Sequence, residues 1–326
     1  MRLRLVAVGV LVGVVVAAAG CARPGPYPSG DIDLIVPAAA GDPTDTVARI
    51  VAPCLGDQLA TEVVVRNVPG EDGVVGNQAL VDAKSDGYTL MISSVSPTAV
   101  TPVLAPERVG YSFEDFLFVG VVRSAPVVLF TAADSPVDAA QTLLAAAKGS
   151  TPVTVAHRGD DTVEGFTLWL MNYLGETDLD SAPVDSDAEI FQGVVAGDFD
   201  AGLATLTPEL LSSIESGEVR LLGSGADLRP KYLRQAPTLY QVLDRTGGGL
   251  PDLMIDTAVS VPFRISDARY AKLATALEEC LRTDDVKREI GPEFVPLDQI
   301  GHGEQWRRYW DLQRGVQLGL NLPKVN

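Results

Sequence analysis

The chain contains 326 residues, of which 43 are Asp or Glu and 25 are Lys or Arg, so its formal net charge is −18. This length suits two domains or one large domain, and 46% hydrophobic residues are enough to bury a core, which excludes disorder as the main state. The acidic charge repels a phosphate backbone, so no nucleic-acid partner is expected. The 2 His and 3 Cys form no cluster with the spacing of metal ligands, so no metal site is expected.

Residues 1–20 have the pattern of a secretory signal. Two arginines form a positive start, and the uncharged stretch over residues 5–20 is shorter than a membrane-spanning helix requires. The run AAGC at 18–21 resembles a bacterial lipobox, in which the cysteine is acylated and becomes the mature N-terminus. The sequence therefore predicts an exported protein, anchored to lipid through Cys21 on the extracytoplasmic face of the bacterial cell membrane. The alternative is plain cleavage near Ala19.

A tether is predicted between the anchor and the folded body. Residues 21–30 contain three prolines and two glycines, which disfavour helix and sheet. The body is expected to begin near Asp31. Loss of residues 1–20 would remove two arginines and no acids, so the mature chain would carry a charge of −20.

The first part of the body alternates short strands with helices. Strands are predicted over 31–36, 62–66 and 88–93. Between them the spacing of apolar residues predicts a helix along 47–59, with Thr44 as its N-cap, and a short helix over 74–83. This order implies a parallel sheet with right-handed crossovers. Two strands, over 118–123 and 127–131, come next, and then a helix over 138–147.

A second series of the same kind predicts a second lobe. Its strands are expected near 153–156, 179–183, 200–204 and 219–223, and its helices over 163–174, 188–196 and 208–216. A strand at 254–261 and helices over 267–282, 284–290 and 304–319 would return to the first lobe. The expected division is signal 1–20, tether 21–30, lobe 1 over 31–126 with 253–326, and lobe 2 over 127–252. Each lobe would be a mainly parallel sheet flanked by helices, with a ligand cleft between the lobes.

Catalytic chemistry has little support in the sequence. No Gly-x-Ser-x-Gly motif occurs, and only His157 and His302 could serve as the base that activates a serine. His302 lies between two glycines before a helix, where a loop or capping role is usual. His157 ends a predicted strand, where cleft residues of α/β proteins lie, and is therefore a candidate ligand contact. No enzymatic activity is expected.

Two further motifs are better explained without a cofactor. The glycines at 70, 73 and 76 do not have the spacing of the dinucleotide-binding fingerprint. The run of acids at 178, 180, 185 and 187 lacks the central glycine and the last glutamate of a calcium-binding EF-hand loop, so these acids are expected to be solvated. No cofactor is therefore predicted.

The two cysteines of the body, Cys54 and Cys280, fall on the apolar stripes of predicted helices. In an exported protein they can form a disulfide if their Cα atoms lie within about 4.4–6.8 Å of each other. Two buried thiols are the alternative.

The loops after the first two strands are the candidate ligand site. Ligands of open α/β sheets bind at the carboxyl ends of the strands, where helix N-termini point free N–H groups at an anion. Alanine and glycine in these loops would let a solute approach the backbone closely.

The body from about Asp31 onward resembles the extracytoplasmic solute receptors of the tripartite tricarboxylate transporter family, also called Bug receptors. The main matching motifs are VPAAAGDPTDTVAR at 36–49, NVPGEDGVVG at 67–76 and SDGYTLMISS at 85–94. Weaker matches are APVDSDAEIFQGVVAGDFDAGL at 182–203 and PTLYQV at 237–242. The resemblance implies a two-lobed periplasmic-binding-protein fold of type II that closes on a small solute, usually a carboxylate, held largely by backbone N–H groups and water.

The resemblance also implies which residues bind the solute. They come from loops of both lobes: Ala38, Ala39, Ala40, Gly41, Thr44, Asp45, Gly70, Gly73, Ser93, Ser94, His157, Gly159 and Asp185. Relative to the family pattern, Asp42, Glu71, Asp72 and Asp185 introduce acids, and Ala38 replaces a phenylalanine. If the acids point inward, the cleft would prefer a solute that carries an amino group or is neutral.

These observations favour a lipid-anchored receptor that captures a small solute by lobe closure and delivers it to membrane transporter subunits. The alternative is a surface ligand sensor or interaction lipoprotein that has the binding fold without a role in transport.

Overall fold

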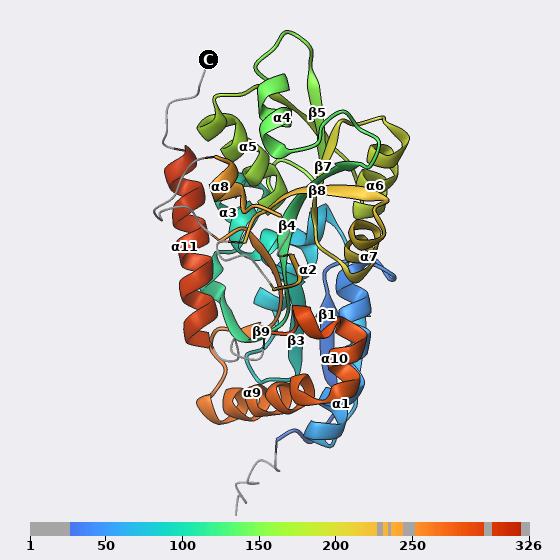
Figure 1. The fold of residues 1–326 in the computed structure, drawn as a ribbon. Helices are drawn as coiled ribbons and strands as arrows, with labels where there is room; N and C mark the ends of the chain where they lie inside the picture. The colour runs from blue at the N-terminus through green and yellow to red at the C-terminus, as the bar shows by residue number, and fades with distance from the viewer. Residues whose placement is uncertain (1–26, 227–230, 234–235, 244–251, 297–301, 321–326) are drawn as a thin grey trace, which may run out of the picture.

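A computed structural model describes residues 27–226, 231–233, 236–243, 252–296 and 302–320 of the chain. In these residues the protein is an α/β structure of two lobes, which lie one above the other in Figure 1. The expected signal over residues 1–20 and the expected lipid site at Cys21 lie outside the described residues. Among the residues that are described, no helix combines the length and apolar character needed to cross a membrane.

Lobe 1 contains the first three strands and the first two helices. Their bounds are β1 Ile32–Val36, α1 Pro43–Leu59, β2 Val63–Asn67, α2 Val74–Val81 and β3 Thr89–Ser94. β1 pairs in parallel with both β2 and β3, as the alternation of strands and helices predicts. β9 (Met254–Pro262) then pairs antiparallel with β3, so the sheet of lobe 1 is mixed.

Helix α1 begins earlier than predicted, and Asp42 rather than Thr44 is its N-cap. The Asp42 side chain accepts a hydrogen bond from the backbone N–H of Thr44 (2.8 Å), and Pro43 occupies the first helical position, where its missing N–H has no cost. The buried residues of α1 recur three and four positions apart and face the core: Val47, Ala48, Val51, Ala52, Leu55 and Leu59. The helix is therefore anchored at its start by a cap and along its length by packing.

β4 (Phe116–Ala132) is one continuous strand that belongs to both lobes. The sequence predicts two strands here, and that prediction is wrong. Residues Phe116–Pro126 pair antiparallel with β9, whereas Val127–Ala132 pair antiparallel with the strands of lobe 2. Pro126 interrupts the sequence pattern because it cannot donate a backbone hydrogen bond, but it lies where β4 changes partners, so the strand continues through it.

Lobe 2 repeats the alternation of strands and helices. Its elements are α4 Ala140–Ala146, β5 Val153–His157, α5 Val163–Gly175, β6 Leu179–Pro183, α6 Asp187–Ala196, β7 Ala201–Thr205, α7 Pro208–Ser216, β8 Val219–Ser224 and α8 Leu239–Val242. β5 pairs in parallel with β6 and β7, while β7 and β8 pair antiparallel with β4. The order of the main sheet path is β2-β1-β3-β9-β4-β7-β5-β6.

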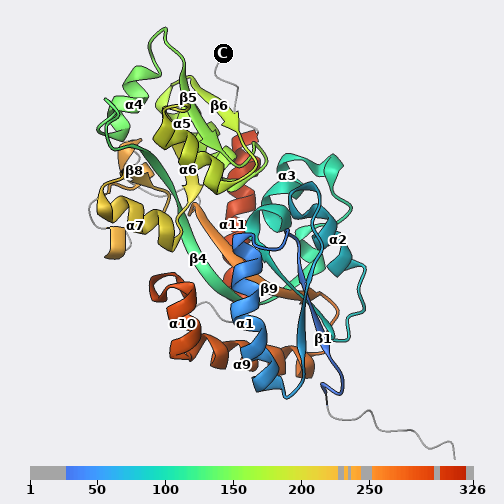
Figure 2. The same ribbon diagram turned by 90° about the vertical axis from the view of Figure 1, so that its right-hand side faces the viewer.

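Helices α9 and α10 return to lobe 1, whereas α11 runs from lobe 1 to the side of α5 in lobe 2, as Figure 1 and Figure 2 show. Their bounds are α9 Asp267–Arg282, α10 Asp284–Ile290 and α11 His302–Leu320. α9 packs against α1 and β4, and a disulfide joins Cys54 of α1 to Cys280 of α9, with their Cα atoms 5.7 Å apart. The remaining short helical turns are Glu71–Gly73, Ser96–Val100, α3 Thr101–Leu104, Pro106–Arg108, Phe113–Asp115, Lys231–Leu233 and Pro292–Phe294.

The folded body begins before Asp31, because Tyr27 is already docked on lobe 1. Its hydroxyl donates to the carbonyl of Gly87 (2.6 Å), its ring makes an edge contact with Tyr88, and the Arg269 guanidinium lies over it at 5.1 Å. Burial raises the pKa of Tyr27 to about 12. The prediction that the folded body begins near Asp31 is therefore late by four residues, because the Tyr27 ring packs against Tyr88 and Arg269 of lobe 1.

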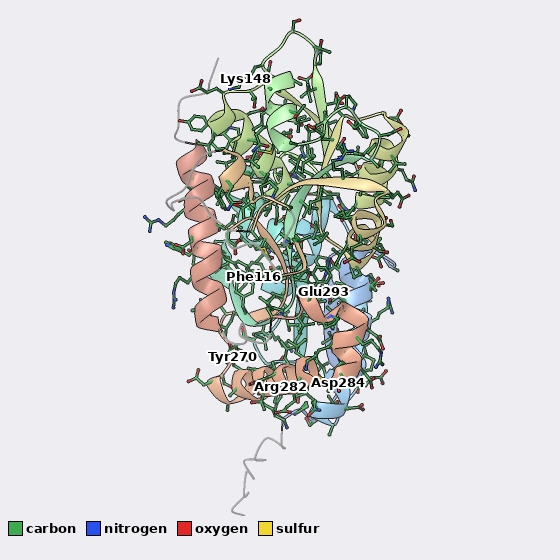
Figure 3. The ribbon with its side chains drawn as sticks, in the orientation of Figure 1. Phe116, Lys148, Tyr270, Arg282, Asp284 and Glu293 are labelled. Atoms are coloured by element: carbon green, nitrogen blue, oxygen red, sulfur yellow. A yellow bond between two sulfur atoms is a disulfide. The ribbon has the colours of Figure 1, made fainter. Side chains whose placement is uncertain are left out.

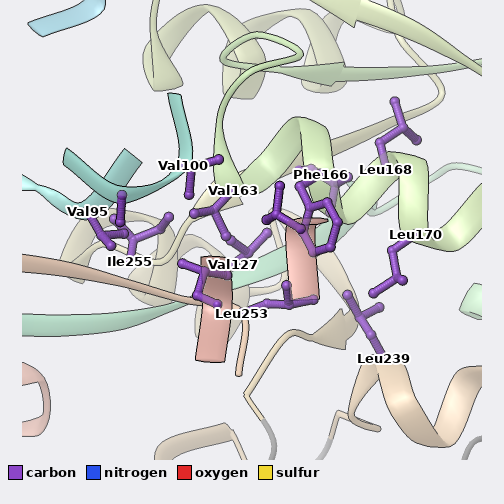
Figure 4. Packing of buried hydrophobic residues seen from close by; sticks show 14 of the residues in the cluster. Val95, Val100, Val127, Val163, Phe166, Leu168, Leu170, Leu239, Leu253 and Ile255 are labelled. Carbon is purple, nitrogen blue, oxygen red and sulfur yellow. The ribbon is translucent and has the colours of Figure 1, made fainter. Parts of the chain in front are cut away.

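The hydrophobic core runs through both lobes without a break. One cluster contains Val95 and Val100 from lobe 1, Ile255 from β9, and Val127 and Val163 from lobe 2; all are buried, and Figure 4 shows them side by side. Outward from this core, Figure 3 places Lys148 at the far end of lobe 2 and Arg282 at the opposite end, in lobe 1. Shared packing and the common strand β4 position the facing walls of the two lobes.

Candidate ligand-binding cleft

A cavity of about 350 Å³ is enclosed by loops of both lobes. Lobe 1 contributes Pro37, Ala38, Ala39, Asp42, Pro43, Thr44, Pro69, Gly70, Asp72, Gly73, Ser94, Ser96 and Pro97. Lobe 2 contributes Arg158, Thr162, Glu164, Asp185, Asp187 and Thr205, while Arg123 comes from β4, and Ile255 and Thr257 from β9. The cavity is therefore the cleft between the lobes, at the carboxyl ends of β1, β2 and β5.

The first loop presents small side chains and free backbone donors to this cleft. Ala38 and Ala39 line it, and the N–H of Ala39 donates to none of the described residues, whereas Ala40, also predicted to bind the solute, is exposed and does not line the cleft. Thr44 lines the cleft at the start of α1, where its own N–H is taken by the Asp42 carboxylate. An anion at this wall would meet backbone donors without needing a lysine or arginine.

Asp45 and Gly41, both predicted to bind the solute, do not line the cleft and instead hold the first loop in shape. The buried Asp45 carboxylate accepts from the N–H of Gly41 (2.8 Å), from Arg49 Nε (2.9 Å) and from Asn67 Nδ2 (2.9 Å). Burial alone would raise the pKa of Asp45, but these hydrogen bonds outweigh it and lower the pKa. Asn67 also donates to the carbonyl of Ala38 (3.0 Å), so one network connects the loops after β1 and β2.

The second loop has a backbone conformation that favours glycine. Residues 70–73 all have positive φ, at 139° for Gly70, 49° for Glu71, 54° for Asp72 and 97° for Gly73. A Cβ atom at Gly73 would lie 3.2 Å from Pro97 Cγ and 3.3 Å from the Pro37 carbonyl oxygen. Gly70 and Gly73 line the cleft, and the N–H of Gly70 donates to none of the described residues.

The third loop contributes one of its two predicted residues. Ser94 lines the cleft, whereas Ser93 is buried and donates its hydroxyl to the carbonyl of Ser94 (3.1 Å). Behind them, Asn77 donates to the carbonyl of Gly73 (2.8 Å) and accepts from the Thr98 hydroxyl (2.9 Å). Ser93 therefore belongs to the support of the wall.

His157 is fully buried and lies behind the cleft wall, and Gly159 does not line the cleft either. The His157 Nδ1 atom accepts from the N–H of Gly159 (3.2 Å), so Nε2 carries the proton and donates to the Ser181 hydroxyl (2.8 Å). Ser181 in turn donates to Asp160 (2.9 Å), and burial lowers the pKa of His157. Because Nε2 is already protonated, His157 cannot accept the Ser181 proton as the base of a serine hydrolase does.

Four charged residues line the cleft although the sequence motifs do not predict them as site residues: Arg123, Arg158, Glu164 and Asp187. Arg123 and Glu164 are single charges within the apolar runs FVGVVRSAPVVLF and VEGFTLWL, and a lone charge in such a run is the signal that could have identified them. The other two follow the ends of β5 and β6, as cleft residues of open sheets do.

These four charges interact within the wall of lobe 2. Buried Arg123 donates from Nη2 to the carbonyl of Leu206 and lies over the Phe294 ring at 5.3 Å. Glu164 is buried and accepts from the Thr205 hydroxyl (3.0 Å); burial, and then the charge of Asp187, raise its pKa. The wall therefore contains carboxyl groups that are ionised less readily than usual.

A second cavity, of about 280 Å³, lies beside α5 and α11. Its walls are mainly apolar and include Leu104, Phe166, Leu168, Trp169 and Val316. It presents few polar groups to orient a solute, so the interlobe cleft is the better candidate site.

Two α/β lobes that share a strand and enclose a polar cleft define a two-lobed solute-binding protein. The family model described as "Tripartite tricarboxylate transporter family receptor" matches residues 47–289. The chain belongs to this family, as the sequence motifs predict, and the family is one of receptors rather than enzymes.

Known proteins of similar sequence and fold support this assignment. Protein BugT of Bordetella pertussis is 33% identical over 256 residues, which cover 73% of this chain and 74% of BugT. MatC of Rhodopseudomonas palustris, solved with bound malate, has a TM-score of 0.70 at 22% identity over 90% of this chain and 97% of MatC. A second R. palustris protein, solved with adipate, has a TM-score of 0.71 at 21% identity over 90% of this chain and 95% of its own. The two solved structures share the fold.

Proposed function

We propose that this protein is an extracytoplasmic receptor that captures a small organic solute with a carboxylate group in the interlobe cleft and delivers it to a membrane transporter. The observation that carries the proposal is the cleft itself: about 350 Å³ is room for a small metabolite, and both lobes line it. Malate and adipate, bound by two proteins of the same fold, are dicarboxylates, which supports the solute class.

The carboxylate would bind to the wall of lobe 1. N–H groups without an acceptor among the described residues are available there at Ala39 and Gly70, both of which line the cleft. Hydrogen bonds to an ionised acceptor are roughly twice as strong as neutral ones, and a helix N-terminus adds about 0.3–1 kcal/mol. Small residues in both loops let the solute reach these donors.

Lobe closure would complete the site. The lobes are joined through β4 and β9, and Arg108 of lobe 1 forms ion pairs with Asp72 of lobe 1 (3.2 Å) and Asp161 of lobe 2. Closing brings Arg158 and Thr162 toward the loops of lobe 1, because all of them line one cavity. A solute that contacts both walls favours the closed form by its differential affinity for that form.

We also propose that residues 1–20 direct export and that Cys21 carries the lipid anchor. The Cys21→Ala variant should be released from membranes when cells are fractionated, because stable anchoring needs the acyl chains. Full retention of this variant in the membrane fraction, equal to that of the wild type, would contradict the anchor.

Thermal unfolding of the purified protein against a library of small metabolites tests the function. A solute present at a hundred times its Kd adds roughly 2.7 kcal/mol to the free energy of unfolding, which is easily measured. We expect a shift from one class of carboxylate and no chemical change in the solute. Turnover of the bound solute would contradict a receptor without catalytic activity, and stabilisation by a protein partner alone would favour the surface-sensor alternative.

A further inference from the structure

Acidic side chains face the cleft from both lobes. Asp42 lies on the wall of lobe 1, and Asp185 and Asp187 lie on the wall of lobe 2. A fourth acid, Asp72, is paired with Arg108 (3.2 Å). Asp42 also caps α1, but its charge remains after it accepts the N–H of Thr44 (2.8 Å). The cleft thus contains more acids than a site for a plain dicarboxylate requires.

Asp187 is only partly satisfied by its neighbours. Its Oδ1 atom is buried and accepts no hydrogen bond from any described residue, and the nearest ion-pair partner of that atom, Arg158 Nη1, is 4.0 Å away. Burial raises the pKa of Asp187, and the charge of Asp42 on the opposite lobe also raises it, whereas Arg158 and Arg123 lower it. Asp42 and Asp187 thus line one cleft from opposite lobes, and the charge of Asp42 disfavours ionisation of Asp187.

The arginines of the cleft reduce this repulsion, but neither donates a hydrogen bond to Oδ1 of Asp187, which has no such partner among the described residues. Arg123 is committed to the carbonyl of Leu206 and to the ring of Phe294, and Arg158 lies on the same lobe as Asp187. The repulsion between two like charges grows as their distance falls, so bringing the lobes together makes it stronger. A cation between the two carboxylates would attract both of them and would therefore favour closure.

We propose that the solute carries a protonated amino group in addition to its carboxylate, and that this amino group lies between Asp42 and Asp187 in the closed cleft. The inference rests on the proposed function. The free N–H groups of lobe 1 serve the carboxylate, and the two acids serve the ammonium group, which has three donors for them. Selection follows because a solute without the amino group leaves the carboxylates facing each other.

Calorimetric titration with matched solutes tests the proposal. Malate is compared with aspartate, and adipate with 2-aminoadipate, so that each pair differs mainly by an amino group. We expect the amino compound of at least one pair to bind at least tenfold more tightly than its partner. Asp42→Asn and Asp187→Asn should each reduce this preference at least threefold, and Asn at position 42 keeps a good helix cap.

Asp198→Asn is the matched control, because Asp198 is an exposed acid of lobe 2 that does not line the cleft. It removes the same charge and should leave the preference unchanged. Equal or tighter binding of the plain dicarboxylates would overturn the inference and leave the proposed function intact. An equal loss of preference in Asp198→Asn would also overturn it, since the effect would then come from net charge. Failure of every solute in the library to bind would overturn the proposed function and this inference together.

Discussion

The two walls of the cleft are built in different ways. The wall of lobe 1 is made of small residues such as Ala38, Ala39 and Gly73, with free backbone N–H groups between them. The wall of lobe 2 is made of long charged side chains, among them Arg158, Glu164 and Asp187. A backbone wall can hold any carboxylate that reaches it, whereas a wall of side chains can differ between members of the family. Under the proposed function, lobe 1 would hold the carboxylate, and the charged side chains, Asp42 of lobe 1 with Asp187 of lobe 2, would select the solute.

The two walls also differ in how they are supported. Lobe 1 holds its loops through the Asp45 network and a disulfide between α1 and α9. Lobe 2 instead contains carboxyl groups at Glu164 and Asp187 whose pKa values are raised by burial. Burying a charge costs free energy that only a partner or a proton recovers. Hydrogen bonds and a disulfide therefore stabilise the wall of lobe 1, whereas buried carboxyl groups destabilise the wall of lobe 2.

The largest expected effect comes from removing the disulfide that supports lobe 1. In the double variant Cys54→Ser with Cys280→Ser, the free energy of unfolding should fall by about 2–5 kcal/mol, because the bond closes a long loop across 226 positions of the chain. Guanidinium unfolding with and without a reductant measures this. An unchanged midpoint in both experiments would mean that the wall of lobe 1 does not depend on this bond.

The second-largest effect should come from a side chain added to the glycine-rich loop of lobe 1. Gly73→Val should weaken solute binding about a hundredfold, because a side chain there meets Pro97 and the Pro37 carbonyl and opposes a positive φ. Gly197→Val in lobe 2 is the control: its φ is also positive, but it does not line the cleft, and its Cβ would have open space. Calorimetry on both variants, with circular dichroism to establish folding, decides the matter. Equal losses would show that backbone strain alone explains the effect.

A smaller effect should appear as a gain of stability in lobe 2. Glu164→Gln keeps an acceptor for Thr205 and removes a buried acid, so the free energy of unfolding at neutral pH should rise by about 0.5–2 kcal/mol. The pKa of Glu164 is raised in the folded state. The carboxyl group therefore has no effect on stability at low pH, where it is protonated in both states, and it lowers the free energy of unfolding of the wild type as the pH rises. The gain should therefore be small near pH 4.5 and grow as the pH rises. A gain that does not depend on pH, or a loss at pH 7.5, would contradict this account.

The smallest effect concerns the contact between the walls. Arg108→Ala removes a partly exposed pair with Asp72 and the pair with Asp161 of lobe 2. A partly exposed pair contributes about 0.2–1 kcal/mol, and only the pair with Asp161 joins the two lobes, so solute affinity should fall by up to about fivefold. Arg282→Ala, which breaks a pair with Glu278 on α9 away from the cleft, should leave affinity unchanged. The same change in both variants would remove any special role for Arg108.

Much of the fold follows from local sequence signals. Helices α9 and α10 agree with their predicted bounds at both ends, and Thr283, which caps α10, marks the break between them. The continuity of β4 could not be predicted, because it depends on a change of pairing partners at Pro126 that only the three-dimensional sheet provides. The start of α1 was missed because Asp42 and Thr44 are both good caps, and the tertiary structure chooses between them.

The candidate site could be predicted as loops but not as side-chain directions. Ala38, Gly70 and Ser94 line the cleft as expected, since the carboxyl ends of the strands place them there. Asp45, in the first turn of α1, and His157, at the end of β5, instead turn inward to hydrogen-bond partners that are remote in sequence. A loop motif locates the backbone, and packing decides which of its side chains a solute can meet.

The central claim, that one solute contacts both walls of the interlobe cleft, is tested most directly by hydrogen–deuterium exchange with and without the tightest-binding solute. We predict slower exchange in residues 38–44 and 69–73 of lobe 1 and, at the same time, in residues 158–164 of lobe 2. Slowing confined to one lobe, or to residues 165–172 beside the apolar cavity of α5, would contradict the account.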